Sequence, residues 1–199
     1  INLSFQNCSF TDTKIHITGS MKISFCSCYF RWIIERKMTL SFKNQRLLTF
    51  TQCIFNSRKI MYYTMIAFVN ISEIFLGDSS FNEISTLSIR IHTSNVFKIE
   101  KTVMFNEKHT DKSKYRNTVI HIQTVRNVFL SSFLAENIYR KLFSSRETSN
   151  LQFNNSNFIN CYCAITIYAE FHFAPSIFIL VANSQFEKCL CTRLRPRVN

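Results

Sequence analysis

The chain has 199 residues, of which 24 are Lys or Arg and 12 are Asp or Glu, so its formal net charge at pH 7 is +12. A balance this basic favours acidic partners. Only two glycines are present, too few for a glycine-rich loop that would cradle a phosphate group. The longest apolar stretches, residues 60–71 and 171–182, are too short to span a bilayer as helices.

One pattern recurs along almost the whole chain. Two apolar residues stand at alternate positions, a small residue follows, and Phe stands two positions after it, as in the copy at residues 151–158. The closing residues, 20 to 28 positions apart, are Phe10, Phe30, Phe55, Phe81, Phe105, Phe133, Phe158 and Phe186. The copy at Phe105 keeps the pattern if one residue bulges out, and the copy at Phe133 has Arg126 at an apolar position.

Alternating apolar residues lie on one face of a β-strand, because successive side chains point to opposite sides. A unit of this length can bury that face only when a neighbouring unit stacks on it. The pattern therefore predicts an all-β parallel solenoid of about eight coils over residues 1–191, with coils about 4.8 Å apart. The small residue is expected to turn inward where each coil bends.

The copies LSFQNCSF, LTFTQCIF and LQFNNSNFINC resemble the repeats of the right-handed parallel β-helix of the pectin-lyase-like superfamily. The likeness is to its non-catalytic, Phe- and Asn-rich extracellular members, and it implies a right-handed coil and an extracellular setting. With so few glycines, the turns are expected to use Asn, Ser, Asp and Thr. Since the first repeat starts at Leu3 without space for a cap, we expect a fragment of a longer solenoid.

The segments between the copies give further predictions in chain order. Residues 31–47 form a basic connection that is either a solvated loop or a face for acidic ligands. The residues of that face would be Arg31, Arg36, Lys37, Lys43 and Arg46. Residues 61–69 and 87–91 have strand character and predict second and third sheets. Residues 106–117 are the most polar segment and predict an exposed loop.

Two more segments complete the prediction. Residues 134–146 are compatible with a short helix outside the barrel, and residues 192–199 are expected to form a basic tail that leaves the repeat.

The eight cysteines allow three interpretations: metal ligands, disulfides and interior packing. Their C-x-C spacing differs from the C-x2-C pairs of structural zinc sites, so no metal site is predicted. Cys8, Cys28 and Cys53 fall at the inward small position, where a free Cys packs as a small hydrophobe.

The last two copies align so that their cysteines match. Cys161 corresponds to Cys189 and Cys163 to Cys191, and stacked coils would bring each pair within reach of a disulfide in an oxidising compartment. Glycosylation triplets begin at Asn2, Asn7, Asn70 and Asn154, and they favour a secreted or cell-surface location.

Two functions stay open. The first is a non-catalytic extracellular recognition or adhesion scaffold that binds acidic glycans or cell-surface proteins. Nucleic acid is less favoured, since the aromatic residues recur at core spacing instead of alternating with basic ones. The alternative is a polysaccharide-active lyase or glycoside hydrolase, which needs clustered carboxylates, whereas the 12 Asp and Glu residues are scattered. No catalytic residue and no cofactor are predicted.

Overall fold

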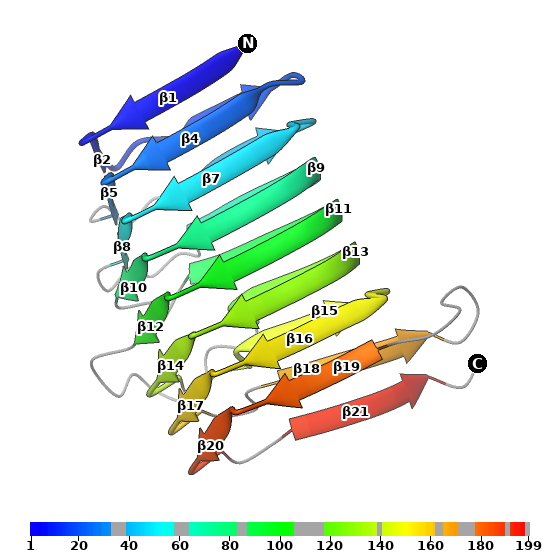
Figure 1. Cartoon of the computed structure of the whole chain (residues 1–199). Coiled ribbons are helices and arrows are strands. Elements are labelled where there is room, and N and C mark those ends of the chain that lie inside the picture. Colours follow the sequence, from blue (N-terminus) through cyan, green and yellow to red (C-terminus); the bar gives the residue numbers. More distant parts are fainter. Residues whose placement is uncertain are drawn as a thin grey trace.

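The computed structural model describes residues 1–32, 39–57, 64–82, 87–105, 118–138, 141–161, 165–170, 178–189 and 192–197. These residues form strands and turns, without a helix, and all of the paired strands are parallel. The prediction of an all-β parallel solenoid is therefore confirmed (Figure 1). Within the described part of the chain, no helix is long and apolar enough to cross a membrane.

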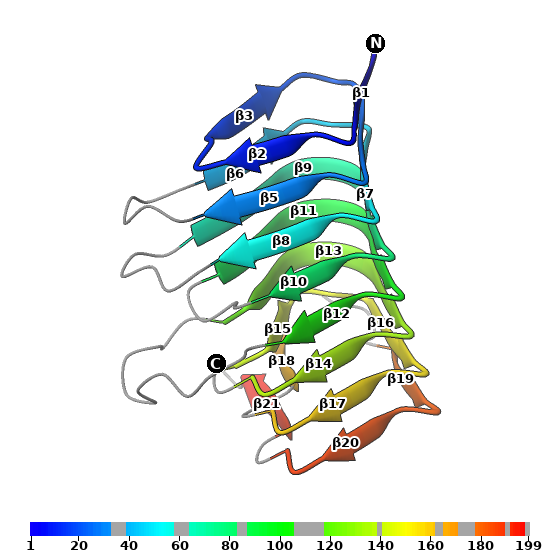
Figure 2. The ribbon, with the colours of Figure 1, turned by 90° about the vertical axis from the view of Figure 1, so that its left-hand side faces the viewer.

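Each coil has three faces (Figure 2). The first face contains β1 (Asn2–Gln6), β4 (Lys22–Cys26), β7 (Leu47–Thr51), the second halves of β9 (Thr64–Gly77), β11 (Leu87–Glu100) and β13 (Ile120–Ser131), then β16 (Asn150–Asn154) and β19 (Phe178–Ala182). The second face contains β2 (Ser9–Thr11), β5 (Tyr29–Trp32), β8 (Ile54–Ser57), β10 (Ser80–Asn82), β12 (Val103–Phe105), β14 (Leu134–Glu136), β17 (Asn157–Ile159) and β20 (Gln185–Glu187). The third face contains β3 (Ile15–Thr18), β6 (Thr39–Lys43), the first halves of β9, β11 and β13, then β15 (Phe143–Arg146), β18 (Ile165–Glu170) and β21 (Thr192–Arg197).

The strands β9, β11 and β13 serve two faces each. They bend at Asn70, Thr93 and Thr124, whose φ angles are 54°, 59° and 55°. A left-handed residue turns the chain sharply while the ladder continues on both sides of it. This bend joins the first and third faces into one 13-stranded sheet, whereas the second face is a separate sheet of eight strands.

The corner between the first and second faces repeats from coil to coil. Its left-handed residues are Asn7, Ser27, Gln52, Asp78, Lys101, Ser132, Asn155 and Asn183. The expectation that turns without glycine use Asn, Ser and Asp holds at most of these positions, because those side chains tolerate this conformation. Gln52 and Lys101 depart from it, and such residues are held there by the rest of the fold.

The residue at the small position directly follows this corner residue. Its side chain points inward and also donates hydrogen bonds. The Cys53 Sγ donates to the carbonyls of Phe25 at 3.5 Å and Thr51 at 3.4 Å. Ser156 Oγ donates in the same way to Leu130 at 3.5 Å and Asn154 at 3.0 Å. Burial raises the pKa of the Cys53 thiol to about 11, so the S–H donor persists at neutral pH. Cys and Ser therefore exchange at this position because both carry a donor.

The core is built from columns of stacked Phe rings. The ring centroid of Phe25 lies 4.7 Å from that of Phe5 and 4.8 Å from that of Phe50, and the interplanar angles are 7° and 4°. A second column passes through Phe30 and Phe55, whose centroids are 4.8 Å apart. Between columns the rings meet edge to face, as aromatic quadrupoles prefer.

The number of turns differs from the sequence prediction. The structure supports about five turns instead of eight. Buried apolar residues lie on all three faces between β4 and β18. The copies at either end extend the sheets but expose core side chains, with Leu3 36%, Val181 47% and Phe186 37% exposed. A terminal copy has a neighbouring coil on one side only, so it is not enclosed.

Two copies of the repeat have a different register from the one predicted. Phe81 pairs with Met104, not with Phe105, so no bulge is needed and Met104 fills the Phe position. In the next copy Ala135 pairs with Met104 and with Phe158. Phe133 thus occupies the small position and Ala135 the large one, an exchange of volume between two neighbouring inward positions.

Two predicted segments are wrong. Residues 134–146 hold the strands β14 and β15 instead of a helix, and the inward positions of β14 and β15 are filled by Ala135 and Phe143. Residues 192–197 form β21, which pairs with β18, instead of a tail. The segment Thr-Arg-Leu-Arg-Pro-Arg alternates at the period of a strand. The predicted loop at 106–117 lies outside the described residues.

Candidate functional site

The third face carries two rows of paired residues, here called lanes, that alternate with its buried apolar residues. One lane runs through Ser41, Ala67, Arg90, His121 and Ser144. The other runs through Lys43, Val69, His92, Gln123 and Arg146. By backbone register the lanes continue through β18 to Arg193 and Arg195 of β21. As far as the structure describes these two lanes, they contain no Asp or Glu, so the third face is basic.

His121 lies at the centre of the basic residues. Burial, together with the charges of Arg90, Lys141, Arg146 and His92, holds the pKa of His121 below its usual range. Lys43, Arg90 and His92 are exposed, whereas His121, Lys141 and Arg146 are half-buried. The basic residues that surround this imidazole come from two stretches far apart in the sequence, residues 90–92 and 141–146, and together they form one positive surface.

A polar groove of about 300 Å³ runs along the edge of the third face, at the corner where β9, β11 and β13 bend. Its lining contains Asn70, Ser72, Thr93, Asn95, Thr124, Arg126, Glu147 and Ser149. Each of the corner residues directly follows a residue of the second lane, as Thr93 follows His92. The groove therefore adds amide and hydroxyl groups next to the basic surface.

Glu147 is the one carboxylate among the described residues that line the groove. Its Oε2 accepts a hydrogen bond from Thr124 Oγ1 at 2.7 Å, and its Oε1 lies 3.8 Å from Arg146 Nε. Glycoside hydrolysis ordinarily uses a pair of carboxyl groups. A single carboxylate that is already engaged fits a positioning role for basic and hydroxyl groups better than acid–base catalysis.

The basic residues predicted from the sequence are only partly brought together. Arg31 lies in β5 on the second face, while Lys43 and Arg46 flank the corner between the third and first faces. Arg36 and Lys37 lie outside the described residues. Of the predicted set, Lys43 belongs to the basic lanes of the third face.

Sequence reasoning missed Arg90, His92, His121 and Arg146 because they are far apart in the chain. A signal for them exists: Arg90 stands seven residues before Phe97, and His121 stands seven before Val128. Alignment of the copies at this offset, upstream of the apolar pattern, places these residues in one lane. The repeat pattern starts at the two apolar residues, so it does not include the positions of Arg90 and His121.

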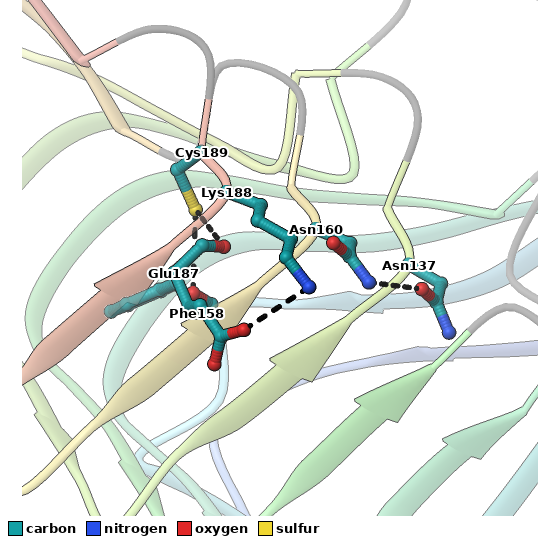
Figure 3. Close-up of polar contacts among 6 residues, drawn as sticks. All are labelled: Asn137, Phe158, Asn160, Glu187, Lys188 and Cys189. Carbon is teal, nitrogen blue, oxygen red and sulfur yellow. Dashed lines mark hydrogen bonds and ion pairs between the residues drawn. The ribbon is translucent and has the colours of Figure 1, made fainter.

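The cysteine positions match the predicted stacking of the last two copies. Cys161 and Cys189 follow the paired residues Ile159 and Glu187, and both are free thiols in the structure. Cys189 Sγ donates to the carbonyls of Phe158 at 3.3 Å and Glu187 at 3.6 Å (Figure 3). A disulfide between Cys161 and Cys189 stays a prediction, and the pair Cys163 and Cys191 lies outside the described residues.

Amide side chains align from coil to coil at this corner and at the corner between the third and first faces. Asn160 Nδ2 donates to Asn137 Oδ1 at 3.1 Å (Figure 3), and Asn70 Nδ2 donates likewise to Asn44 Oδ1 at 2.8 Å. Of the predicted glycosylation acceptors, Asn2, Asn7 and Asn70 are exposed and Asn154 is half-buried. Among the described residues, no group of three or more His, Cys, Asp or Glu is arranged to hold a metal ion.

No family model matches the chain, and neither a curated protein nor a solved structure matches it significantly. The chemistry of the third face and its groove is therefore the basis on which a function can be assigned.

Proposed function

We propose that this solenoid is a non-catalytic recognition scaffold that binds acidic glycans on its third face. The observation that carries the proposal is the convergence of the cations Lys43, Arg90 and Arg146, together with His92 and His121, in two adjacent lanes without a described Asp or Glu. Positive surfaces attract polyanions and speed their encounter. Regular strand spacing of about 4.8 Å also suits a ligand that repeats along its length.

The polar groove supports a glycan over other polyanions. Asn, Ser and Thr side chains line its edge, and such groups both donate and accept hydrogen bonds, as sugar hydroxyls require. Aromatic residues are absent from the described lining, whereas single-stranded nucleic acid is ordinarily held by aromatic stacking. The partner we infer is therefore a glycan that carries carboxylate or sulfate groups.

The proposal also covers the handedness of the coil, its superfamily and its location. We infer a right-handed coil, because crossovers between parallel strands are almost always right-handed, and a place in the pectin-lyase-like superfamily on the likeness of the repeats. An extracellular or cell-surface location agrees with the exposed acceptor residues Asn2, Asn7 and Asn70 of three glycosylation triplets and with acidic glycans as partners. Acidic cell-surface glycoproteins are partners of the same chemistry.

The test is glycan binding by variants that remove charges from different faces. Lys43→Gln/Arg90→Gln removes two exposed charges from the third face, and Lys22→Gln/Lys101→Gln removes two exposed charges elsewhere. Exposed ionic contacts contribute about 0.5 kcal/mol each, so the third-face variant is expected to lose about fivefold in affinity for sulfated or uronate oligosaccharides. The control variant is expected to bind as the wild type does.

Binding is measured at low and at physiological salt, next to an assay for released reducing sugar. Weaker binding at higher salt without sugar release agrees with the proposal. Equal losses in both variants, or release of sugar ends, would reject it, and the latter would favour a polysaccharide-active enzyme.

A further inference from the structure

The first face carries an aromatic lane that the proposed acidic-glycan site does not use. Five residues pair in turn across adjacent strands of this face, the broad row of arrows in Figure 1: Thr49, Phe75, Lys98, Phe129 and Gln152. Phe75 and Phe129 are half-buried and alternate with the inward core residues of their strands. They lie two strands apart, a separation of about 9.6 Å.

The position of the Phe75 ring depends on a glycine. A Cβ built on Gly77 would lie 2.6 Å from both Cε1 and Cζ of Phe75, so the ring lies over Gly77. Gly77 does not adopt a left-handed φ, hence the glycine provides space here and not backbone freedom. It is one of only two glycines in the chain, and the space it leaves lets an aromatic ring lie against the outside of the sheet.

The cation between the two rings is already engaged. Lys98 Nζ lies 5.6 Å from the centroid of the Phe75 ring and 2.8 Å from Glu100 Oε2. Its positive charge is therefore balanced by a neighbouring carboxylate, and its ammonium group lies over the Phe75 ring. The three outward lanes of the first face contain Lys22, Glu73, Lys98 and Glu100 as their charged residues, two of each sign, in contrast to the basic third face.

Amide groups lie beside the aromatic lane. Asn150 Nδ2 donates to Asn127 Oδ1 at 3.3 Å, and Gln152 Nε2 donates to Asn150 Oδ1 at 3.2 Å. Gln152 is also the lane neighbour of Phe129. An amide has two donor hydrogens and an acceptor oxygen, so each of these side chains retains capacity for a ligand hydroxyl.

We propose that the first face is a second binding site, for a neutral, extended oligosaccharide. The C–H groups on one face of a pyranose ring are attracted to the negative face of an aromatic ring, and Phe75 and Phe129 provide two such rings. Their separation of about 9.6 Å is close to the length of two β-1,4-linked pyranose units. The neutral charge balance and the amides suit hydroxyl groups in place of carboxylates.

The first test compares three variants in binding to neutral β-1,4-linked oligosaccharides, cellohexaose and chitohexaose. Phe75→Ala/Phe129→Ala is expected to lose about tenfold in affinity, since each aromatic contact contributes modestly. Gly77→Ala is expected to lose a smaller factor, because its Cβ displaces the Phe75 ring. Phe105→Ala, a half-buried Phe on the second face, is the matched control and is expected to bind like the wild type.

The second test separates this site from the third face. Binding of the neutral oligosaccharides is expected to be insensitive to salt and unchanged in Lys43→Gln/Arg90→Gln. Three results would each overturn the first-face site. The wild type could fail to bind the neutral oligosaccharides, or Phe75→Ala/Phe129→Ala could bind them as well as the wild type does. The third result is a loss of affinity in Phe105→Ala as large as the loss in Phe75→Ala/Phe129→Ala. These outcomes leave the acidic-glycan proposal to its own test, since a different face and ligand are used; circular dichroism of each variant confirms that the solenoid is intact.

Discussion

His121 lies half-buried on the third face among basic side chains from β11, β15 and the residues before β15. Burial and these cations keep the pKa of His121 below its usual range, so the folded protein holds this imidazole neutral under conditions in which an unfolded chain would protonate it. A group with a depressed folded pKa binds its proton more weakly in the folded state. The unfolded state then gains protons first as the pH falls.

The expected consequence is a loss of stability on acidification that depends on this residue. As the pH falls from 7 through the ordinary His pKa of about 6.5 towards the lower folded value, the melting temperature of the wild type should fall. His121→Gln removes the titrating group, so its melting temperature should fall less over the same range. Thermal unfolding followed by circular dichroism at a series of pH values measures this difference. The same slope in both proteins would contradict the assignment, and similar melting temperatures at pH 8 serve as the control for folding.

The strand β14 and the turn before it show how the coils tolerate a change in the repeat. Phe133 and Ala135 are both buried, at 1% and 0% exposure, and they exchange the small and large positions of the other copies. The Phe133 ring centroid lies 5.9 Å from that of Phe158, at an interplanar angle of 60°, unlike the near-parallel stacks elsewhere. Interior packing is close to that of crystals, so the volumes at these two positions must be matched to each other.

A double-mutant cycle tests this exchange of volume. Phe133→Ser leaves a cavity and should destabilise the protein by about 3 kcal/mol, while Ala135→Phe overpacks the coil and should destabilise it by about 2 kcal/mol. The double variant restores the usual pattern, with Ser at the small position and Phe at the large one. Its loss of stability should therefore be smaller than the sum of the single losses by at least about 1 kcal/mol. Additive losses in urea unfolding would show that the two positions are independent.

At the scale of elements, the sequence predicts the strands better than it predicts their register. The alternating apolar residues that begin each copy are local in the chain, so the strands of the first face could be predicted from them. The spacing of the Phe residues does not predict the positions of Met104 and Ala135, because a coil can exchange volume between neighbouring inward positions. The third-face residues Arg90 and His121 meet only after stacking, and no contiguous basic segment marks them.

At the scale of the whole molecule, the first and third faces differ in their chemistry. The third face is basic, the first is balanced in charge and carries the aromatic lane, and both belong to the one 13-stranded sheet that bends at Asn70, Thr93 and Thr124. Because each lane repeats at the spacing of the coils, a single substitution removes one point of a longer surface. Function at this scale is expected to depend on the number of charges along a lane.

The most direct test of the basic third face is hydroxyl-radical footprinting of the intact chain, with and without a sulfated oligosaccharide, read out by mass spectrometry. His92 and His121 report on the third face, and Phe75 and Phe129 report on the first. Our account predicts that the acidic ligand lowers oxidation of His92 and His121 and leaves that of Phe75 and Phe129 unchanged. Protection of the two Phe residues without protection of the two His residues, or no protection at saturating ligand, would contradict it.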